Sequence, residues 1–333
     1  MPAGGKNLGV HVGRHREKQL VVFALAEGLA QRLVDAHPVA LDRAQQLEAA
    51  GILKRAANNL GANSLNTITY SAAGNGWGPG QPYTAGKALP KQNYRVTRSI
   101  DYVNAAISDD VTRSRAEPRG GTGVPLTGEQ NLIEAVGNNV SWNVVAKTVQ
   151  PGNRFVTDRV PQIWLNPQGI IKAAQRNSAT LTFVTEGKKS LGVVSFTEPG
   201  RFKAKAYIND AFEVERIEAT VPNPVLGDIQ VVEKFSEYRE FGNAKFPTRI
   251  EETQAGQTTL QLVVTDVQPN GKVAIEVPAA ATNFKESVAS QKLADGVWLL
   301  AGGSHNSLAV EMKDHAVVIE GPLYDARSKA VID

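Results

Sequence analysis

The stretch GVWLLAGGSHNSLAVEMKDHAVVIEGP, residues 296–322, decides which fold we expect of the carboxy-terminal part of the chain. It contains three aliphatic and β-branched runs, at 296–303, 307–312 and 315–320, which are bounded by Gly, Asp or Pro. Such runs between turn residues are typical of short strands. The sequence therefore predicts three consecutive strands, followed by a first helix over 325–332.

Residues 296–322, followed by ARSKAVI at 326–332, resemble the opening of a metallo-β-lactamase-fold (MBL-fold) hydrolase domain. In that family the next strand ends in a zinc motif of the form H-x-H-x-D-H, and no such motif follows Asp333 here. The resemblance implies the N-terminal part of a zinc-dependent hydrolase, inactive alone. It implies no cofactor in this chain, with zinc expected only in a full-length family member.

Upstream of this stretch, the sequence predicts a long series of strands. The segment FKAKAYI at 202–208 alternates between apolar and polar residues, as a half-buried strand does. Short turns rich in Gly, Pro and Asn separate the runs, so neighbouring strands should be antiparallel. The runs are 179–186, 190–198, 201–208, 212–221, 228–240, 245–254 and 258–267.

These patterns predict an α+β fold. We expect a curved antiparallel sheet, a half-barrel-like meander with a few helices, followed by the first strands of an incomplete αββα MBL fold. The predicted parts are a tail with helices at 1–62, the sheet domain at 63–278, a linker with a short helix at 279–295, and the MBL-like fragment at 296–333.

The sheet region also resembles the domain that precedes the hydrolase in some exported MBL-fold proteins. The phrases PRGG at 118–121 and VPNPVLGD at 221–228 carry this resemblance, which implies a periplasmic or exported protein. The expected shape is similar to the half-barrel of lipoprotein-carrier proteins, by analogy only. A half-barrel with an apolar interior could hold a lipid-like ligand, or its own helices could fill it; we favour the filled form.

The amino-terminal residues leave the localisation open. Residues 17–36 have helical apolar spacing, but a signal peptide is the alternative, with Arg14 and Arg16 in its charged start. Its apolar run, 20–23, is shorter than the roughly 7–15 residues that such a peptide needs. His11 and His15 have a spacing that would suit zinc on a helix, but a solvated tail is the simpler interpretation.

Composition excludes several classes of function. The 333 residues carry a net charge of +3, which gives no case for a nucleic-acid partner. There is no cysteine, so thiol catalysis, disulfides and Cys-ligated zinc are excluded. No apolar run approaches the roughly 20 residues of a transmembrane segment.

Candidate chemistry in the sequence is sparse. Asp109 and Asp110 could be a carboxylate pair, but a solvated hairpin is the preferred interpretation, since adjacent strand residues face opposite ways. Ser304-His305, His315 and Glu320 are interpreted as polar turn and strand-end residues. The catalytic residues remain unknown, and no metal ligand is predicted.

Three tryptophans are the candidate ligand-binding residues. Trp77 lies in a predicted glycine loop at 74–80, where a hydrophobic plug is the favoured role. Trp142 and Trp164 lie in a predicted strand and just before a predicted helix that Asn166 would cap. The alternatives to a hydrolase are a binding module for an apolar ligand and an interaction subunit of a split hydrolase. Its partners would be a missing catalytic half or a second copy paired through the C-terminal sheet.

Overall fold

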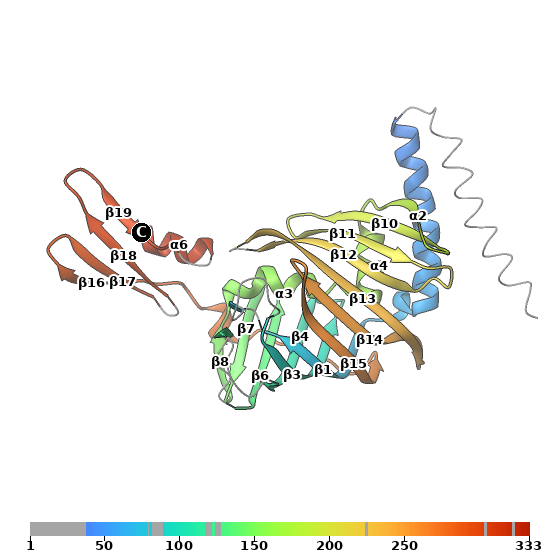
Figure 1. The fold of residues 1–333 in the computed structure, drawn as a ribbon, viewed down its shortest axis with the longest axis horizontal. Helices are drawn as coiled ribbons and strands as arrows, with labels where there is room; N and C mark the ends of the chain where they lie inside the picture. The colour runs from blue at the N-terminus through green and yellow to red at the C-terminus, as the bar shows by residue number, and fades with distance from the viewer. Residues whose placement is uncertain are drawn as a thin grey trace, which may run out of the picture.

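The computed structural model describes residues 38–78, 80–81, 89–116, 122–123, 128–223, 226–302, 305–321 and 324–333. These residues form a thirteen-stranded antiparallel sheet, a separate four-stranded sheet, a two-stranded pairing and several helices (Figure 1). The predicted helix at 17–36, His11, His15 and His37 lie outside the described residues, as do the phrase at 118–121 and Ser304.

The large sheet consists of two meanders that meet at one seam. The first meander is β1 (Thr67–Trp77), β3 (Lys91–Asp101), β4 (Ala106–Arg115), β6 (Gln130–Gly137), β7 (Val140–Val145) and β8 (Thr148–Pro151). The second is β9 (Thr180–Glu186), β10 (Lys189–Glu198), β11 (Phe202–Ile208), β12 (Val214–Asn223), β13 (Gly227–Phe241), β14 (Ala244–Gln254) and β15 (Gln257–Pro269). Strand β1 pairs antiparallel with β15, and the edges of the sheet are β8 and β9. The short strands β2 (Gly80–Gln81) and β5 (Thr122–Gly123) pair with each other.

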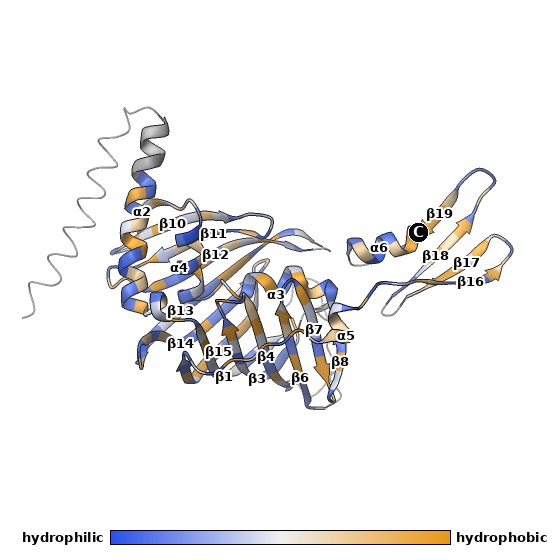
Figure 2. Ribbon diagram, turned by 180° about the vertical axis from the view of Figure 1, so that it is seen from behind, coloured by the Kyte–Doolittle hydropathy of each residue, from blue (hydrophilic) through white to orange (hydrophobic). Residues whose placement is uncertain are grey.

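The strands of the second meander confirm the alternation predicted from the sequence. All seven predicted runs form strands, and each pairs antiparallel with its neighbour along the chain. Their apolar positions form one main core, and Figure 2 shows hydrophobic and hydrophilic stretches alternating along the strands. A predominantly antiparallel sheet with few helices is therefore confirmed, and the described strands do not close it into a barrel.

Helices cover the concave side of the sheet. The connection between the two edges contains η2 (Asn153–Phe155), α3 (Val156–Gln162) and α4 (Pro167–Arg176), and α4 packs against α2 (Pro38–Leu60). The predicted cap of α4 is confirmed, because the Asn166 side chain accepts a hydrogen bond from the Gly169 amide at 2.9 Å. A short η1 (Ala62–Ser64) follows α2.

The position of α3 shows how strongly the sheet curves. This helix contacts β4 and β6 on one side and β12 on the other, although β4 and β12 are separated by five strands in the sheet order. A flat sheet would hold these strands far apart, since neighbouring strands are about 4.8 Å from each other. The sheet therefore curves around α3, which lies against its concave face.

Two local predictions in the first meander are wrong. Residues 74–77 are part of β1, not of a glycine loop, because the backbone of Gly74 packs directly against β15: a Cβ there would lie 2.0 Å from the Gln261 carbonyl oxygen. Asp109 is buried in β4 and pairs with Arg98, whereas we expected a solvated hairpin. Asp110 faces outward, as the alternation requires.

The carboxy-terminal residues form a four-stranded antiparallel sheet in chain order. Its strands are β16 (Ala289–Ala294), β17 (Val297–Ala301), β18 (Asn306–Glu311) and β19 (Ala316–Ile319), followed by α6 (Asp325–Ile332). The last three strands and the helix confirm the prediction. The predicted linker at 279–295 holds the short α5 (Ala279–Thr282), but also β16, which pairs with β17 across an Asp295-Gly296 turn. Gly296 has φ of 71°, the conformation that Asp-Gly hairpin turns favour.

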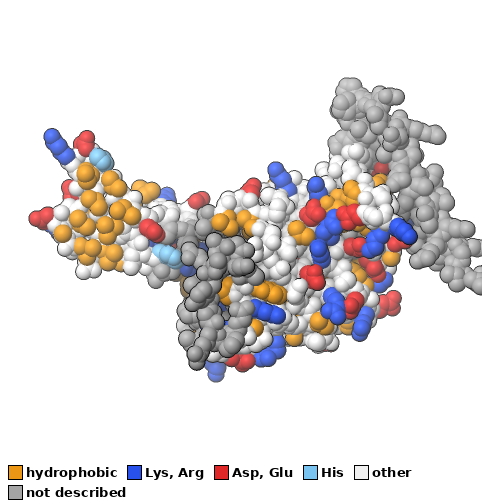
Figure 3. Space-filling model, viewed as in Figure 1, with side chains coloured by type: hydrophobic (Ala, Val, Ile, Leu, Met, Phe, Trp, Pro, Cys, Tyr) orange, Lys and Arg blue, Asp and Glu red, His pale blue; other side chains and the backbone are white. Residues whose placement is uncertain are grey.

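This small sheet is less covered than the large one. Val317, Val318 and Ile319 of β19 are all exposed, and Figure 3 shows hydrophobic side chains gathered on the face of the small sheet turned to the viewer. The division of the chain into domains remains a prediction. None of the helices among the described residues combines the length and the apolarity needed to cross a bilayer.

Candidate ligand site on the concave face

The strand register places four polar residues in one line across the concave face. Tyr70 lies opposite Arg98, Arg98 opposite Asp109, and Asp109 opposite Glu134, on strands β1, β3, β4 and β6. Directly opposed residues of antiparallel strands point to the same face. We call these four residues the polar row.

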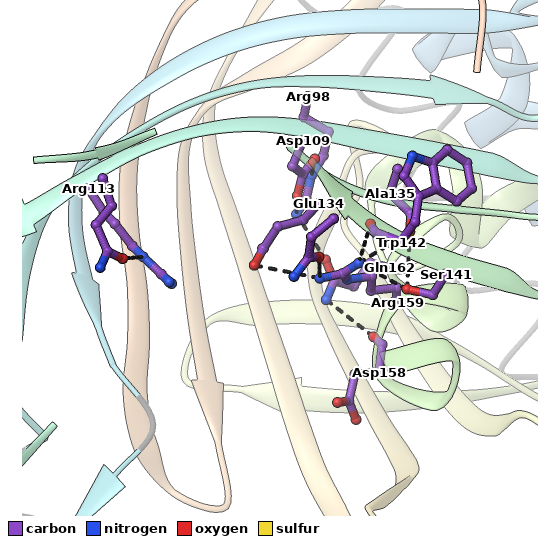
Figure 4. Close-up of polar contacts among 12 residues, drawn as sticks. Arg98, Asp109, Arg113, Glu134, Ala135, Ser141, Trp142, Asp158, Arg159 and Gln162 are labelled. Atoms are coloured by element: carbon purple, nitrogen blue, oxygen red, sulfur yellow. Dashed lines mark hydrogen bonds and ion pairs between the residues drawn. The ribbon is translucent and has the colours of Figure 1, made fainter. Parts of the chain in front are cut away.

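The polar row is built around a buried ion pair. Arg98 donates from Nε to Asp109 Oδ1 at 2.8 Å and from Nη2 to Oδ2 at 2.6 Å, a bidentate arrangement (Figure 4). Although burial opposes charge on the guanidinium, Asp109 holds the pKa of Arg98 well above its ordinary value. Burial also raises the pKa of Tyr70 to about 12, with Arg98 acting in the opposite direction. At neutral pH, Arg98 is therefore positively charged and Tyr70 is neutral.

Polar contacts attach α3 to this row. Gln162 Oε1 accepts a hydrogen bond from Arg98 Nη2 at 2.9 Å. Arg159 donates to Ser141 Oγ at 2.9 Å and to Asn143 Oδ1 at 2.6 Å, and its Nη2 lies 3.6 Å from Glu134 Oε1 (Figure 4). The helix thus lies over the concave face through side-chain hydrogen bonds as well as apolar packing.

An apolar row lies next to the polar row, two residues further along each strand. It consists of Ala72, Val96, Val111 and Leu132, which are opposed in the same register and all buried. These four residues belong to the main core. The wall of the concave face therefore changes from charged to hydrocarbon within one step along the strands.

The next step along the strands gives an accessible row: Gly74, Tyr94, Arg113 and Gln130, all only half-buried. Burial raises the pKa of the Tyr94 hydroxyl above its ordinary range, although the side chain keeps partial contact with solvent. Arg113 Nε donates to Gln130 Oε1 at 3.2 Å in this row. The accessible row is where the concave face meets solvent.

Two carboxyl groups lie on the other meander, also on the core-facing side. Glu233 of β13 and Glu252 of β14 are directly opposed and both buried. Burial, and then the neighbouring Glu252 carboxyl, raise the pKa of Glu233 well above its ordinary value, with Arg98 acting in the opposite sense. Glu252 Oε1 accepts hydrogen bonds from Thr259 Oγ1 and from Gln254 Nε2. The raised pKa favours the protonated form of the Glu233 carboxyl.

The structure does not bring the three predicted tryptophans together. Trp142 packs on the outer face of the sheet with Ala135 and Ala281. Trp77, opposite Lys91, is half-buried at the end of β1, with the Lys91 ammonium 5.7 Å from its ring centroid. Trp164 is buried in the core beside Tyr102 and under Arg176, whose guanidinium lies 3.7 Å from the ring centroid. None of the three belongs to the accessible row, and their role in ligand binding stays a prediction.

The histidines that the structure describes do not form a metal centre. His315 lies in the turn before β19 and contacts Asp314, and His305 is an exposed residue whose carbonyl accepts from Arg327. Within the described ranges, no group of three or more His, Asp or Glu side chains is arranged to hold an ion.

Comparison with known proteins gives a match in structure but none in sequence. No protein-family model matches the sequence, and no curated protein matches it. A solved structure of a LolA superfamily protein from Nitrosomonas europaea matches with a TM-score of 0.43 and 15% identity. The alignment covers 68% of this chain and 94% of that protein. At this level the likeness carries no statement about a ligand.

The resemblance to an MBL-fold hydrolase is corrected by this comparison, because the matching structure is a LolA superfamily protein and not a metallo-hydrolase. The prediction that the chain is part of a truncated hydrolase is therefore wrong as well. The physical reason lies in the 296–322 pattern itself. Apolar runs between Gly, Asp and Pro turns specify consecutive antiparallel strands, which the structure has, but any small meander shares that pattern.

Proposed function

We propose that this chain is a binding module that holds a lipid-like ligand against the concave face of its large sheet. The observation that carries the proposal is the accessible row beside the apolar row. Tyr94 and Gly74 keep partial contact with solvent, while Val96 and Ala72, one step along the same strands, are buried hydrocarbon. When an apolar ligand enters there, its hydrocarbon surface leaves water and contacts aliphatic side chains. This transfer is the favourable contribution to the free energy of such binding.

The strand next to β1 supports the same proposal. Leu260 of β15 lies opposite Glu252 and Gly76, on the core-facing side, and remains half-buried. The edges β8 and β9 are bridged by the α3–α4 connection and not by strand pairing. Opening at this bridge would break side-chain hydrogen bonds, such as that between Arg98 and Gln162, but no ladder of backbone hydrogen bonds.

The test is extraction of the natively purified chain with organic solvent, followed by mass spectrometry, and titration with lauryl alcohol as a neutral apolar probe. We expect a co-purifying amphiphile or saturable binding of the probe. Leu260→Trp should narrow the entrance and weaken probe binding by about tenfold, which is about 1.4 kcal/mol. Gln261→Trp is the matched control, because Gln261 is exposed on the other face of the same strand.

The result that contradicts the proposal is equally definite. If nothing co-purifies and the wild-type chain does not bind the probe, the concave face is filled by its own side chains. Equal loss of binding in both tryptophan variants would place the probe elsewhere on the molecule.

A further inference from the structure

The arginines on the concave face differ in how their charge is balanced. Arg98 has Asp109 as a bidentate partner, and Arg159 lies 3.6 Å from Glu134. Arg113 instead bonds the neutral amide of Gln130, and no carboxylate of a described residue lies within ion-pair distance of it. Arg113 is thus a half-buried guanidinium whose charge has no counter-ion among the residues that the structure describes.

The groups around Arg113 indicate what kind of ligand would neutralise its charge. The residue lies directly opposite Tyr94 on β3, and directly opposed residues of antiparallel strands point to the same face. Val111 of the apolar row is two residues away on the same strand, a distance of about 7 Å. The site therefore presents a cation and a phenol beside a hydrocarbon wall.

We infer that Arg113 binds the anionic head group of an amphiphilic ligand whose hydrocarbon part lies on the apolar row. This inference rests on the proposed function and specifies the class of ligand. A guanidinium recognises carboxylate and phosphate through paired hydrogen bonds, and Tyr94 can donate a further one. A neutral lipid would leave the Arg113 charge without a counter-ion.

The experiment compares lauric acid, lauryl phosphate and lauryl alcohol, which share one hydrocarbon chain, by isothermal titration of the full chain. We expect an anionic probe to bind at least about tenfold more tightly than the alcohol, because hydrogen bonds between charged groups are stronger than those to a neutral hydroxyl. The ratio between lauric acid and lauryl phosphate distinguishes a carboxylate from a phosphate head group.

Two variants locate the head group. Arg113→Gln should abolish the preference for the anionic probe over lauryl alcohol, whereas Arg113→Lys should retain part of the preference. Arg95→Gln is the matched control, because Arg95 is an exposed arginine on the outer face of the neighbouring strand β3. It should change neither affinity.

The failures of the two proposals are distinguishable. If the wild-type chain binds the alcohol and the acid equally, the inference about Arg113 is wrong while the binding module stands. An anion preference that survives in Arg113→Gln also overturns the inference. If no probe binds at all, the proposed function itself fails.

Discussion

Arg98 and Asp109 lie opposite each other on neighbouring strands, and their side chains form two hydrogen bonds, of 2.8 and 2.6 Å, inside the concave face. Only 17% of the Arg98 side-chain surface and 8% of the Asp109 side-chain surface are exposed. Removal of one member of such a pair leaves an uncompensated charge in the protein interior. The pair therefore stabilises the contact between β3 and β4 only when both side chains are present.

Asp109→Ala should destabilise the chain by about 3–5 kcal/mol, since it leaves Arg98 buried without a counter-ion. The double variant Arg98→Met with Asp109→Leu should recover a large part of this loss, because it removes both charges. Urea unfolding of the wild type, Arg98→Met, Asp109→Leu and the double variant measures the coupling. Strict additivity of the two single effects would show that the pair contributes no coupling energy.

Glu233→Gln should stabilise the chain at neutral pH. The folded-state pKa of Glu233 is raised, so the folded state keeps its proton while the unfolded state releases one above an ordinary pKa of about 4.3. The stability contributed by the protonated carboxyl is complete below that value and declines as pH rises toward the folded-state pKa. Each unit of the shift corresponds to about 1.4 kcal/mol.

The measurement for Glu233 is the free energy of unfolding as a function of pH. We expect the wild type to lose stability from about pH 4 upward relative to Glu233→Gln. Glu240→Gln provides the control, because Glu240 is exposed on the same strand. A wild type and a Glu233→Gln variant with parallel pH profiles would rule out the raised pKa.

Gly74→Ala should destabilise the seam between the two meanders. Its Cβ would lie 2.0 Å from the Gln261 carbonyl oxygen, a backbone atom that cannot move without distorting β15. Gly51→Ala is the opposite case, since a Cβ at Gly51 meets nothing within 4 Å and the residue lies inside α2. Thermal unfolding should therefore show a lowered midpoint for Gly74→Ala and a gain of roughly 0.5–1 kcal/mol for Gly51→Ala.

Asn166→Ala should cost about 1–2 kcal/mol, because it removes the cap of α4 and leaves the Tyr102 hydroxyl without its acceptor at 2.7 Å. Asn166→Ser should retain most of the capping energy but not the contact to Tyr102. Chemical denaturation of the two variants, alone and combined with Tyr102→Phe, separates the two contributions. If Asn166→Ala and Asn166→Ser lose the same amount, capping is not the cause.

Alternation of apolar residues predicts the strands of the second meander, and Asn166 before a helical segment predicts the cap of α4, because both signals depend on neighbours in the sequence. It does not predict the accessible row. Tyr94, Arg113 and Gln130 come together through strand pairing over 36 residues, and no local pattern marks which face of a strand is concave. Arg98 on an otherwise apolar face was the one available signal of the polar row.

Other features escaped prediction for local reasons. The Asp295-Gly296 pair is a strong hairpin signal, but the polar residues of β16 hid the strand that precedes it. The glycines of β1 suggested a loop, whereas Gly74 is needed for a close approach of two backbones. A glycine within a strand and a glycine within a loop look alike until the neighbouring strand is known.

The pairing of β1 with β15 has a consequence for how the chain acquires its structure. Residues near position 70 must wait for residues near position 265 before the seam can form. Contacts of such long sequence separation slow folding, and during synthesis the unpaired side of β1 stays open while almost two hundred further residues emerge. We therefore expect refolding to be rate-limited by the joining of two preformed halves, with β1 and β15 the last strands to gain protection from hydrogen exchange.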